Sequence, residues 1–292
     1  MIETTVLKAL RQLNIADSLA EYSNAKAIFY QAAPPDKDAG WSGSQYPRLD
    51  YNITWQYNPE RKTAGTMAVN VWCLIETATP PEDIAIAIQD EIDATFFTDA
   101  DGTYCATWAR SDPFEITGTE PQMIGVTVYF DVWAFPAIGS IEPNPAAGFS
   151  AYVKAIYPDA KYIGVDTLAE IWKATDSSPA FYARMQGDTV QAKQTTWACA
   201  TITANMMGHV IAPSQGAANN MIRGICQTLA IDGEISLPYA RTDWTPMIIT
   251  QLAYSTSANP MQQGQITLKG DYRILRAPEE NTALEHINIT GG

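Results

Sequence analysis

ARSDPFEI (residues 109–116) and ARTDWTPM (residues 240–247) are two stretches of one 292-residue chain that open on nearly the same four residues. Four matching residues alone are weak evidence, so the surrounding sequence has to decide whether they mark a repeat. A helical pattern precedes each stretch, and a strand pattern that ends a hairpin follows it. We therefore predict a duplicated fold. The competing interpretation is two α+β domains with similar turn chemistry.

The composition is that of a folded, acidic protein. Hydrophobic residues make up 46% of the chain, charged residues 17%, and the net charge is −14, most of it in residues 1–150. This acidity argues against nucleic-acid binding by phosphate neutralisation, but it is compatible with a negative channel through which DNA slides. The sequence has no run of about 18 apolar residues and no signal-peptide core, so we expect an intracellular protein with no membrane partner.

Hydrophobic periodicity divides the first half into a helix, three strands, a second helix and a hairpin. The second helix has the clearest signals, because prolines and two acidic residues open it and isoleucines recur at a spacing of four. The predicted elements are 3–13, 25–30, 46–57, 66–76, 80–97, 104–116 and 123–135.

The second half repeats this order. Its predicted elements are a helix at 166–175 capped by Asp166, strands at 178–185 and 195–211, a helix at 215–230, and a hairpin of 234–249 and 264–275. In the last strands, Val126-Thr127-Val128 with Asp131 matches Ile266-Thr267-Leu268 with Asp271. The prediction is an α+β fold of two similar domains, each a mostly antiparallel sheet with helices packed on it.

Proline and glycine content suggests the domain boundaries. We predict a first domain at 1–140, a linker at 141–165, a second domain at 166–276 and a polar tail at 277–292. A short helical piece near residues 152–157 is expected within the linker.

Signals for catalysis are poor, and no cofactor or metal is expected. The chain has two histidines, and His209 lies in an apolar strand where a structural histidine is expected. The four cysteines are far apart and are interpreted as buried thiols. We therefore expect a protein that is not an enzyme. The alternative is an enzyme that acts on a small molecule through carboxylates such as Asp112 and Asp243.

The repeated motif predicts ion pairs. Arg110 and Asp112 are two apart on a strand and share one face, as do Arg241 and Asp243. Each pair forms either a solvated structural contact within the chain or a contact across a subunit boundary.

Two surface features are candidate functional sites. The loop 31–45 is rich in Pro, Gly and Ser, and its Pro34, Pro35 and Trp41, together with the following Tyr46, are predicted to contact a partner unless the loop folds on itself. The second helix ends in carboxylates that its buried isoleucine face should push outward. We predict that Asp90, Glu91 and Asp93 line a channel; the alternative is a solubilising outer surface.

The first half resembles the tail terminator, or tail-completion, proteins of long-tailed bacteriophages. The resemblance lies in the N-terminal helix, the strand that leads into the Pro-rich loop, the Tyr46-Pro47 step, the PPEDIAIAIQDEID helix and the final Val132-Trp133 element. It covers residues 1–135. The second half keeps the order of elements but lacks the long loop and the Tyr-Pro step, which departs from the usual single domain.

The resemblance implies a structural virion protein that assembles into a homo-hexameric ring. Such a ring caps the tail tube, stops its polymerisation and meets the head-side connector or stopper protein, with a sheath as a further partner in a contractile tail. DNA passes through the lumen without sequence-specific binding. The alternatives are a head–tail connector completion protein or another tail-tube or baseplate component.

Overall fold

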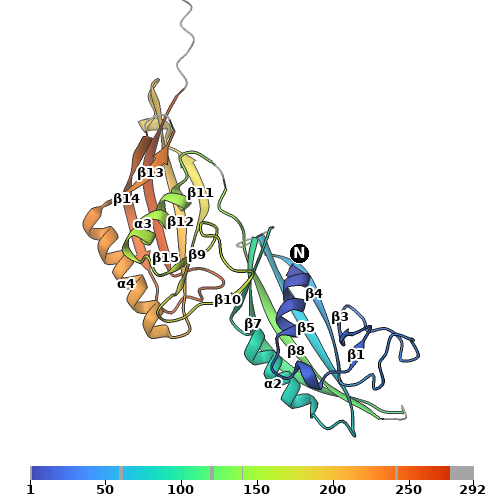
Figure 1. Cartoon of the computed structure of the whole chain (residues 1–292). Helices are drawn as coiled ribbons and strands as arrows, with labels where there is room; N and C mark the ends of the chain where they lie inside the picture. Colours follow the sequence, from blue (N-terminus) through green and yellow to red (C-terminus); the bar gives the residue numbers. More distant parts are fainter. Residues whose placement is uncertain are drawn as a thin grey trace, which may run out of the picture.

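The computed structural model consists of two lobes, each a curled sheet with helices on one face (Figure 1). It describes residues 2–58, 62–100, 102–118, 122–139, 141–240 and 243–276. In both lobes antiparallel strands dominate, and a single short strand pairs in parallel at one edge. The predicted α+β class with two similar domains is confirmed.

The first lobe packs two helices, α1 (Ile2–Arg11) and α2 (Pro81–Ile92), against a seven-stranded sheet. Ile84, Ile88 and Ile92 of α2 are fully buried, as their spacing predicts. The order across this sheet is β10 (Ile171–Lys173), β6 (Thr95–Asp99), β7 (Gly102–Ile116), β8 (Met123–Phe135), β5 (Lys62–Leu74), β4 (Arg48–Asn58) and β3 (Ile28–Tyr30). A small ribbon of β1 (Glu21–Tyr22) and β2 (Ala25–Lys26) follows the short helix η1 (Ala16–Ser18).

The second lobe packs α3 (Pro145–Ile156) and α4 (Gln215–Asp232) against a six-stranded sheet. Ser214 caps the start of α4, and Gly233 ends it in the left-handed conformation that glycine adopts without strain. The order across the sheet is β13 (Glu234–Tyr239), β14 (Asp243–Tyr254), β15 (Ile266–Leu275), β12 (Cys199–Ile211), β11 (Ala180–Val190) and β9 (Lys161–Tyr162). The short helix η2 (Ala192–Gln194) precedes β12.

The two sheets have the same strand order once β10 is set aside. β6-β7-β8-β5-β4-β3 corresponds to β13-β14-β15-β12-β11-β9, and in both lobes the last strand pairs in parallel. A β-bulge also interrupts the same hairpin in each lobe, between Trp108 and Arg110 in β7 and between Ile249 and Gln251 in β14. The fold is therefore duplicated in topology and in detail.

The register across the bulges tests the two sequence matches. Tyr129 pairs with the residue after the first bulge and Lys269 with the residue after the second, so residues 126–128 coincide with 266–268, and Asp131 with Asp271. That match is confirmed.

The match that first indicated the repeat is wrong as an equivalence. Asp112 pairs with Thr127 in the middle of a hairpin, whereas Asp243 pairs with Tyr239 at the turn between β13 and β14. Position 243 therefore coincides with Gly102, which opens β7 in the same way. The two motifs are therefore similar in sequence but do not occupy equivalent positions. Residues 126–128 and 266–268 are the matching residues that do.

The predicted helix at 166–175 is also wrong. The segment instead holds β10, whose Trp172 stacks on Phe96 of the first sheet at a ring distance of 4.1 Å. Asp166, read as a helix cap, accepts the backbone N–H of Tyr162 and so closes a turn. The helix that opens the second lobe is α3, which lies with β9 inside the stretch predicted as a linker.

Two further boundaries differ from the sequence prediction. The helix predicted to reach residue 97 ends at Ile92, and β6 follows it directly. The strand predicted over 234–249 divides into β13, which ends at Tyr239, and β14, which begins at Asp243. The proposed ends of the domains stay predictions, and the tail at 277–292 lies outside the described residues.

The chain crosses between the lobes three times. Residues 136–144 lead to α3 and β9, residues 163–170 return to place β10 on the first sheet, and residues 174–179 lead back to β11. A buried cluster joins the lobes where these segments pass. Its members are Phe96, Cys105, Phe135, Ile163, Trp172, Ala174, Ala180, Tyr182, Ile211 and Met261.

Candidate interaction surfaces

Trp41 anchors the loop 31–45 to its own lobe. Its ring makes edge contacts with Tyr22 at 5.1 Å and Phe29 at 5.8 Å, and its Nε1 donates to the carbonyl of Pro35 at 3.0 Å. The side chain is half-buried, and its backbone forms an isolated bridge with Tyr22. The loop therefore folds on itself, which was one of the two alternatives, and contact with a partner stays a prediction.

Charged and aromatic groups hold the rest of the loop. Asp36 forms an ion pair with Arg48 at 2.6 Å, and the guanidinium lies 4.5 Å from the centre of the Tyr46 ring. Tyr46 is buried, and burial raises its pKa. Asp38 accepts hydrogen bonds from the backbone N–H of Gly40 and from the hydroxyl of Tyr22. Both bonds lower the pKa of the Asp38 carboxyl group, and the bond from Gly40 has the larger effect. Pro34 is half-buried and Pro35 is exposed, so part of this loop surface stays open to solvent.

The acidic end of α2 separates into two kinds of carboxylate. Asp90 is exposed and Glu91 is half-buried, in a groove that Lys8 and Lys173 also line. The ammonium group of Lys173 donates to the carbonyl of Asp90 at 2.7 Å, so a cation sits at the helix C-terminus, where the dipole favours it.

Asp93 has a structural contact that the sequence does not reveal. Its carboxylate accepts the backbone N–H of Trp108 at 2.7 Å, next to the bulge in β7. Asp93 is therefore tied to the sheet, and it differs from Asp90, whose side chain points to solvent. Whether any of the three residues lines a channel stays a prediction.

Arg110 lies on the sheet face that α1 and α2 leave open. It donates to Asp112 at 2.8 Å, and its guanidinium lies 4.1 Å from the centre of the Tyr129 ring. These contacts raise the pKa of Arg110, first through the hydrogen bond to Asp112. Both partners are more than half exposed, so the ion pair contributes little to stability.

The second motif lies at the start of β14. Arg241 and the side chain of Asp243 lie outside the described residues, and the backbone of Asp243 opens β14. Asp112 and Asp243 belong to different sheets and to non-equivalent strand positions. The geometry therefore gives no support to a shared carboxylate site.

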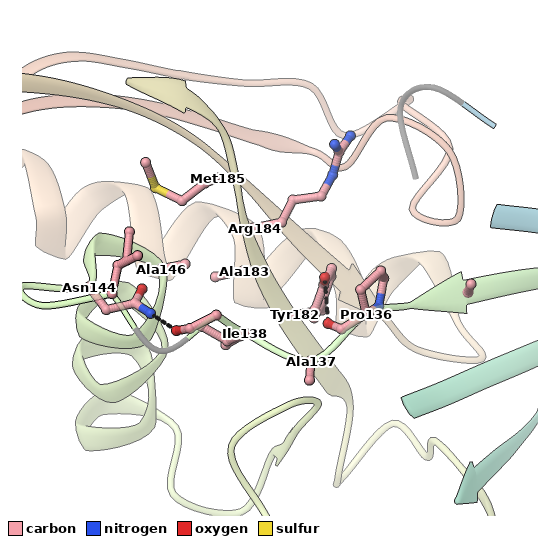
Figure 2. A pocket seen from close by; sticks show the side chains of 12 residues that line it. Pro136, Ala137, Ile138, Asn144, Ala146, Tyr182, Ala183, Arg184 and Met185 are labelled. Carbon is pink, nitrogen blue, oxygen red and sulfur yellow. Dashed lines mark hydrogen bonds between the residues drawn. The ribbon is translucent and has the colours of Figure 1, made fainter. Parts of the chain in front are cut away.

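A pocket of about 250 Å³ lies at the junction of the lobes. Figure 2 shows its walls, in which Tyr182 donates to the carbonyl of Pro136 at 2.9 Å and Asn144 caps α3 while bonding the carbonyl of Gly139. Most of the lining is Ala, Pro, Ile and Met. The bond from Tyr182 ties β11 of the second lobe to the residue that follows β8 of the first.

The reactive residue types are mostly held in structural roles. His209 is fully buried, with Nδ1 at 2.7 Å from the carbonyl of Pro260 and Nε2 accepting from Arg184 at 3.2 Å, which confirms a structural histidine. Burial raises the pKa of Cys73 to about 12 and that of Cys226 to about 11. The described part of the chain contains no group of three or more His, Cys, Asp or Glu residues placed to hold a metal ion.

The exposed tryptophans are the feature that sequence reasoning missed. Their place in strands suggests that most of the eight are core residues, yet Trp172 alone falls in the buried class. Trp197 is 89% exposed and Trp244 is 55% exposed. Because strands have two faces and one face of each sheet has no helix on it, strand position alone does not predict burial.

Comparisons with known proteins identify no family. No family model matches the chain, and no curated protein matches it. A chain of the virion of a native gene transfer agent particle matches with 15% identity and a TM-score of 0.31, over 45% of this chain and 92% of that one. A second solved structure without a descriptive name matches with 12% identity and a TM-score of 0.30, over 46% of this chain and 97% of that one. Scores this low carry no argument.

Among the described helices, none combines the length and the apolar character needed to cross a bilayer.

Proposed function

We propose that this chain is a structural component of a phage-type tail, and specifically a terminator that forms a ring on the end of the tail tube. The ring would stop tube polymerisation and present its other face to the head-side connector. The single observation that supports this best is the architecture of the first lobe, in which α1, strands, α2 and a final hairpin occur in the order that the terminator resemblance implies.

Charge supports the same role. Most of the net charge of −14 lies in the first half, and Asp90 lies at the exposed end of α2. A ring multiplies each charge by the number of its subunits, and negative walls repel the phosphates of passing DNA. Asp90 and Glu91 are the residues that we propose for the lumen, although Lys8 and Lys173 beside Glu91 reduce the local field.

Position in the particle tests the proposal. Tail tubes isolated from particles that contain this chain are stripped of it, incubated with the purified chain carrying a gold label, and imaged by electron microscopy. We expect gold at one end of each tube, the end that faces the head, and none on tubes given gold alone. Label along the tube or at the baseplate end would contradict a terminator and would favour a tube or baseplate component.

A second position would identify the alternative. A head–tail connector completion protein would bind filled heads before any tail is present, whereas a terminator binds tubes. Incubating the labelled chain with isolated heads therefore separates the two roles.

A further inference from the structure

The duplicated fold shows which surface of the second lobe corresponds to the surface that the first lobe buries at the junction. In the first lobe, Phe135 at the end of β8 contacts Tyr182 of the second lobe, with ring centres 5.3 Å apart. Counted from the bulges, Phe135 coincides with Leu275 at the end of β15. The first position is 1% exposed and the second is 43% exposed.

The residues near Leu275 are also exposed. Thr103, beside Phe135 in the first lobe, is buried, and it coincides with Trp244, which is 55% exposed. Ile248 lies on the same face of β14, four residues further along, and is 48% exposed. Trp197 precedes β12 at the same end of the sheet and is 89% exposed. We call Trp197, Trp244, Ile248 and Leu275 the β15 patch.

The correspondence also shows what would meet this patch. His209 in β12 coincides with Trp72 in β5, from the pairing of these strands with β15 and β8. Tyr182 pairs with His209 and Arg48 pairs with Trp72, so Tyr182 in the second lobe coincides with Arg48 in the first. Arg48 lies beneath the loop 31–45, where it pairs with Asp36 and faces the rings of Trp41 and Tyr46. If the junction within the chain is repeated between chains, the β15 patch of one copy lies on the loop 31–45 of the next.

The shape of the molecule permits this repetition. The end of β15 and the loop that surrounds β1 and β3 lie at opposite ends of the two-lobed molecule (Figure 1). Exposed Arg273 and Arg276 border the patch, and the loop carries Asp36 and Asp38 against one lysine, Lys37. Ile75 directly follows β5 and is 56% exposed. The last residue of β5 pairs with Met123, whose sulfur lies 3.0 Å from the hydroxyl of Tyr46, so Ile75 adds apolar surface at this edge.

We infer that the chain associates with a second copy of itself head to tail, the β15 patch of one copy docking on the loop 31–45 of the other and repeating the junction between the lobes. Such a contact joins two different surfaces, so it propagates from copy to copy and forms a ring when the rotation between copies closes, or an open filament when it does not. The inference deepens the ring proposed above by naming its faces, and it depends on that proposal only for its biological role.

Sedimentation equilibrium of the full chain tests whether the patch carries self-association. Trp244→Glu and Leu275→Glu place a charge on the apolar surface, and we expect each to raise the dissociation constant by about tenfold or more, as for residues at the centre of an interface. The matched control is Ile231→Glu, which changes an 84% exposed isoleucine of α4 on the helix-covered side and should leave the constant unchanged. Circular dichroism should show all three variants folded. A strictly monomeric wild type, or equal effects of patch and control variants, would overturn the inference.

Cross-linking tests the second face. A photoreactive benzophenone amino acid replaces Leu275 in unlabelled chain, which is mixed with nitrogen-15-labelled wild type before irradiation. We expect cross-linked peptides that join position 275 to residues 31–51 or 75 of the labelled copy. Cross-links confined to one isotope state would place the patch against its own chain, and mixed cross-links to another surface would place it on a different face; either result rejects this contact. The two experiments separate the two proposals. Gold at the tube end without the expected cross-links would support the terminator and reject the head-to-tail contact. The expected cross-links without any tube binding would support the contact and reject the terminator.

Discussion

Aspartates of the first lobe differ in their roles although they look alike in the sequence. Asp50 is buried beneath the open sheet face and accepts from Asn70 at 2.6 Å and from the indole of Trp72 at 2.5 Å. Asp93 accepts a backbone N–H, Asp38 closes a loop and Asp90 points to solvent. Each substitution therefore has its own expected effect, and a count of acidic residues predicts none of them.

Asp93→Ala should destabilise the first lobe. It removes the acceptor for the N–H of Trp108, and because water reaches this site we expect a loss of about 1 kcal/mol in the free energy of unfolding. Urea denaturation measures it, with Asp90→Ala as the control that should change little. Equal stabilities of the two variants would show that the hydrogen bond to Trp108 contributes nothing.

Asp38 should make the order of the loop 31–45 depend on pH. Its pKa is lowered in the folded chain, so its contribution is complete above the ordinary value of about 4 and is lost as pH falls through the lowered value. The protection of the Gly40 amide against hydrogen exchange, measured relative to its intrinsic rate at each pH, should therefore fall in acid. Asp38→Asn should remove this dependence, and an unchanged acid response in that variant would assign it to another group.

At the scale of elements, β10 joins the lobes by adding a strand from the second half to the edge of the first sheet. Three residues pair with β6, and Trp172 stacks between Phe96 and the ammonium group of Lys161, which lies 4.7 Å from the indole centre. Lys173 reaches α2 from the same strand. A short strand therefore binds the sheet, a helix and the other lobe together.

Trp172→Ala should separate the unfolding of the two lobes. Removing a buried indole that stacks on Phe96 costs about 3–5 kcal/mol, and the loss falls on the junction. Calorimetry should show two transitions where the wild type shows one. Ile231→Ala is the control, since that side chain is 84% exposed, lies outside the β15 patch and should give a change within about 0.5 kcal/mol. A single transition at a lower temperature would show that the two lobes stay coupled without the Trp172 indole and would contradict this prediction.

The elements that the sequence predicts well are those set by local pattern. The isoleucine spacing of α2, and the length and Gly stop of α4, specify helices before any tertiary contact forms. β10 has no such pattern, because its three residues become a strand only when Phe96 and Phe97 lie beside them. Similarly, Asp243 matches Asp112 in sequence, but it lies at the start of β14, where it pairs with Tyr239. The contact of Asp93 with Trp108 depends on the position of the β-bulge, which no local pattern predicts.

At the scale of the molecule, the lobes share a topology but differ in charge. If the first lobe lines a channel, Asp90→Lys with Glu91→Lys should make the assembled ring retain DNA. The effect should weaken as salt rises, because counterion release drives such binding. Fluorescence anisotropy of labelled duplex measures it, with Glu234→Lys and Asp188→Lys of the second lobe as a control of equal charge change. Equal retention by both double variants would place Asp90 and Glu91 on an outer surface.

The triple crossing between the lobes limits how this protein can be divided. A protease that cuts once within residues 136–144 leaves the other two passages intact, so the halves should stay together until denatured. A gene truncated after residue 140 loses the strand that covers Phe96 and exposes an apolar edge. Any single exchange point between the lobes therefore separates β10 from the sheet that it completes, and we expect such a chimera to fold only when the new β10 still packs on Phe96.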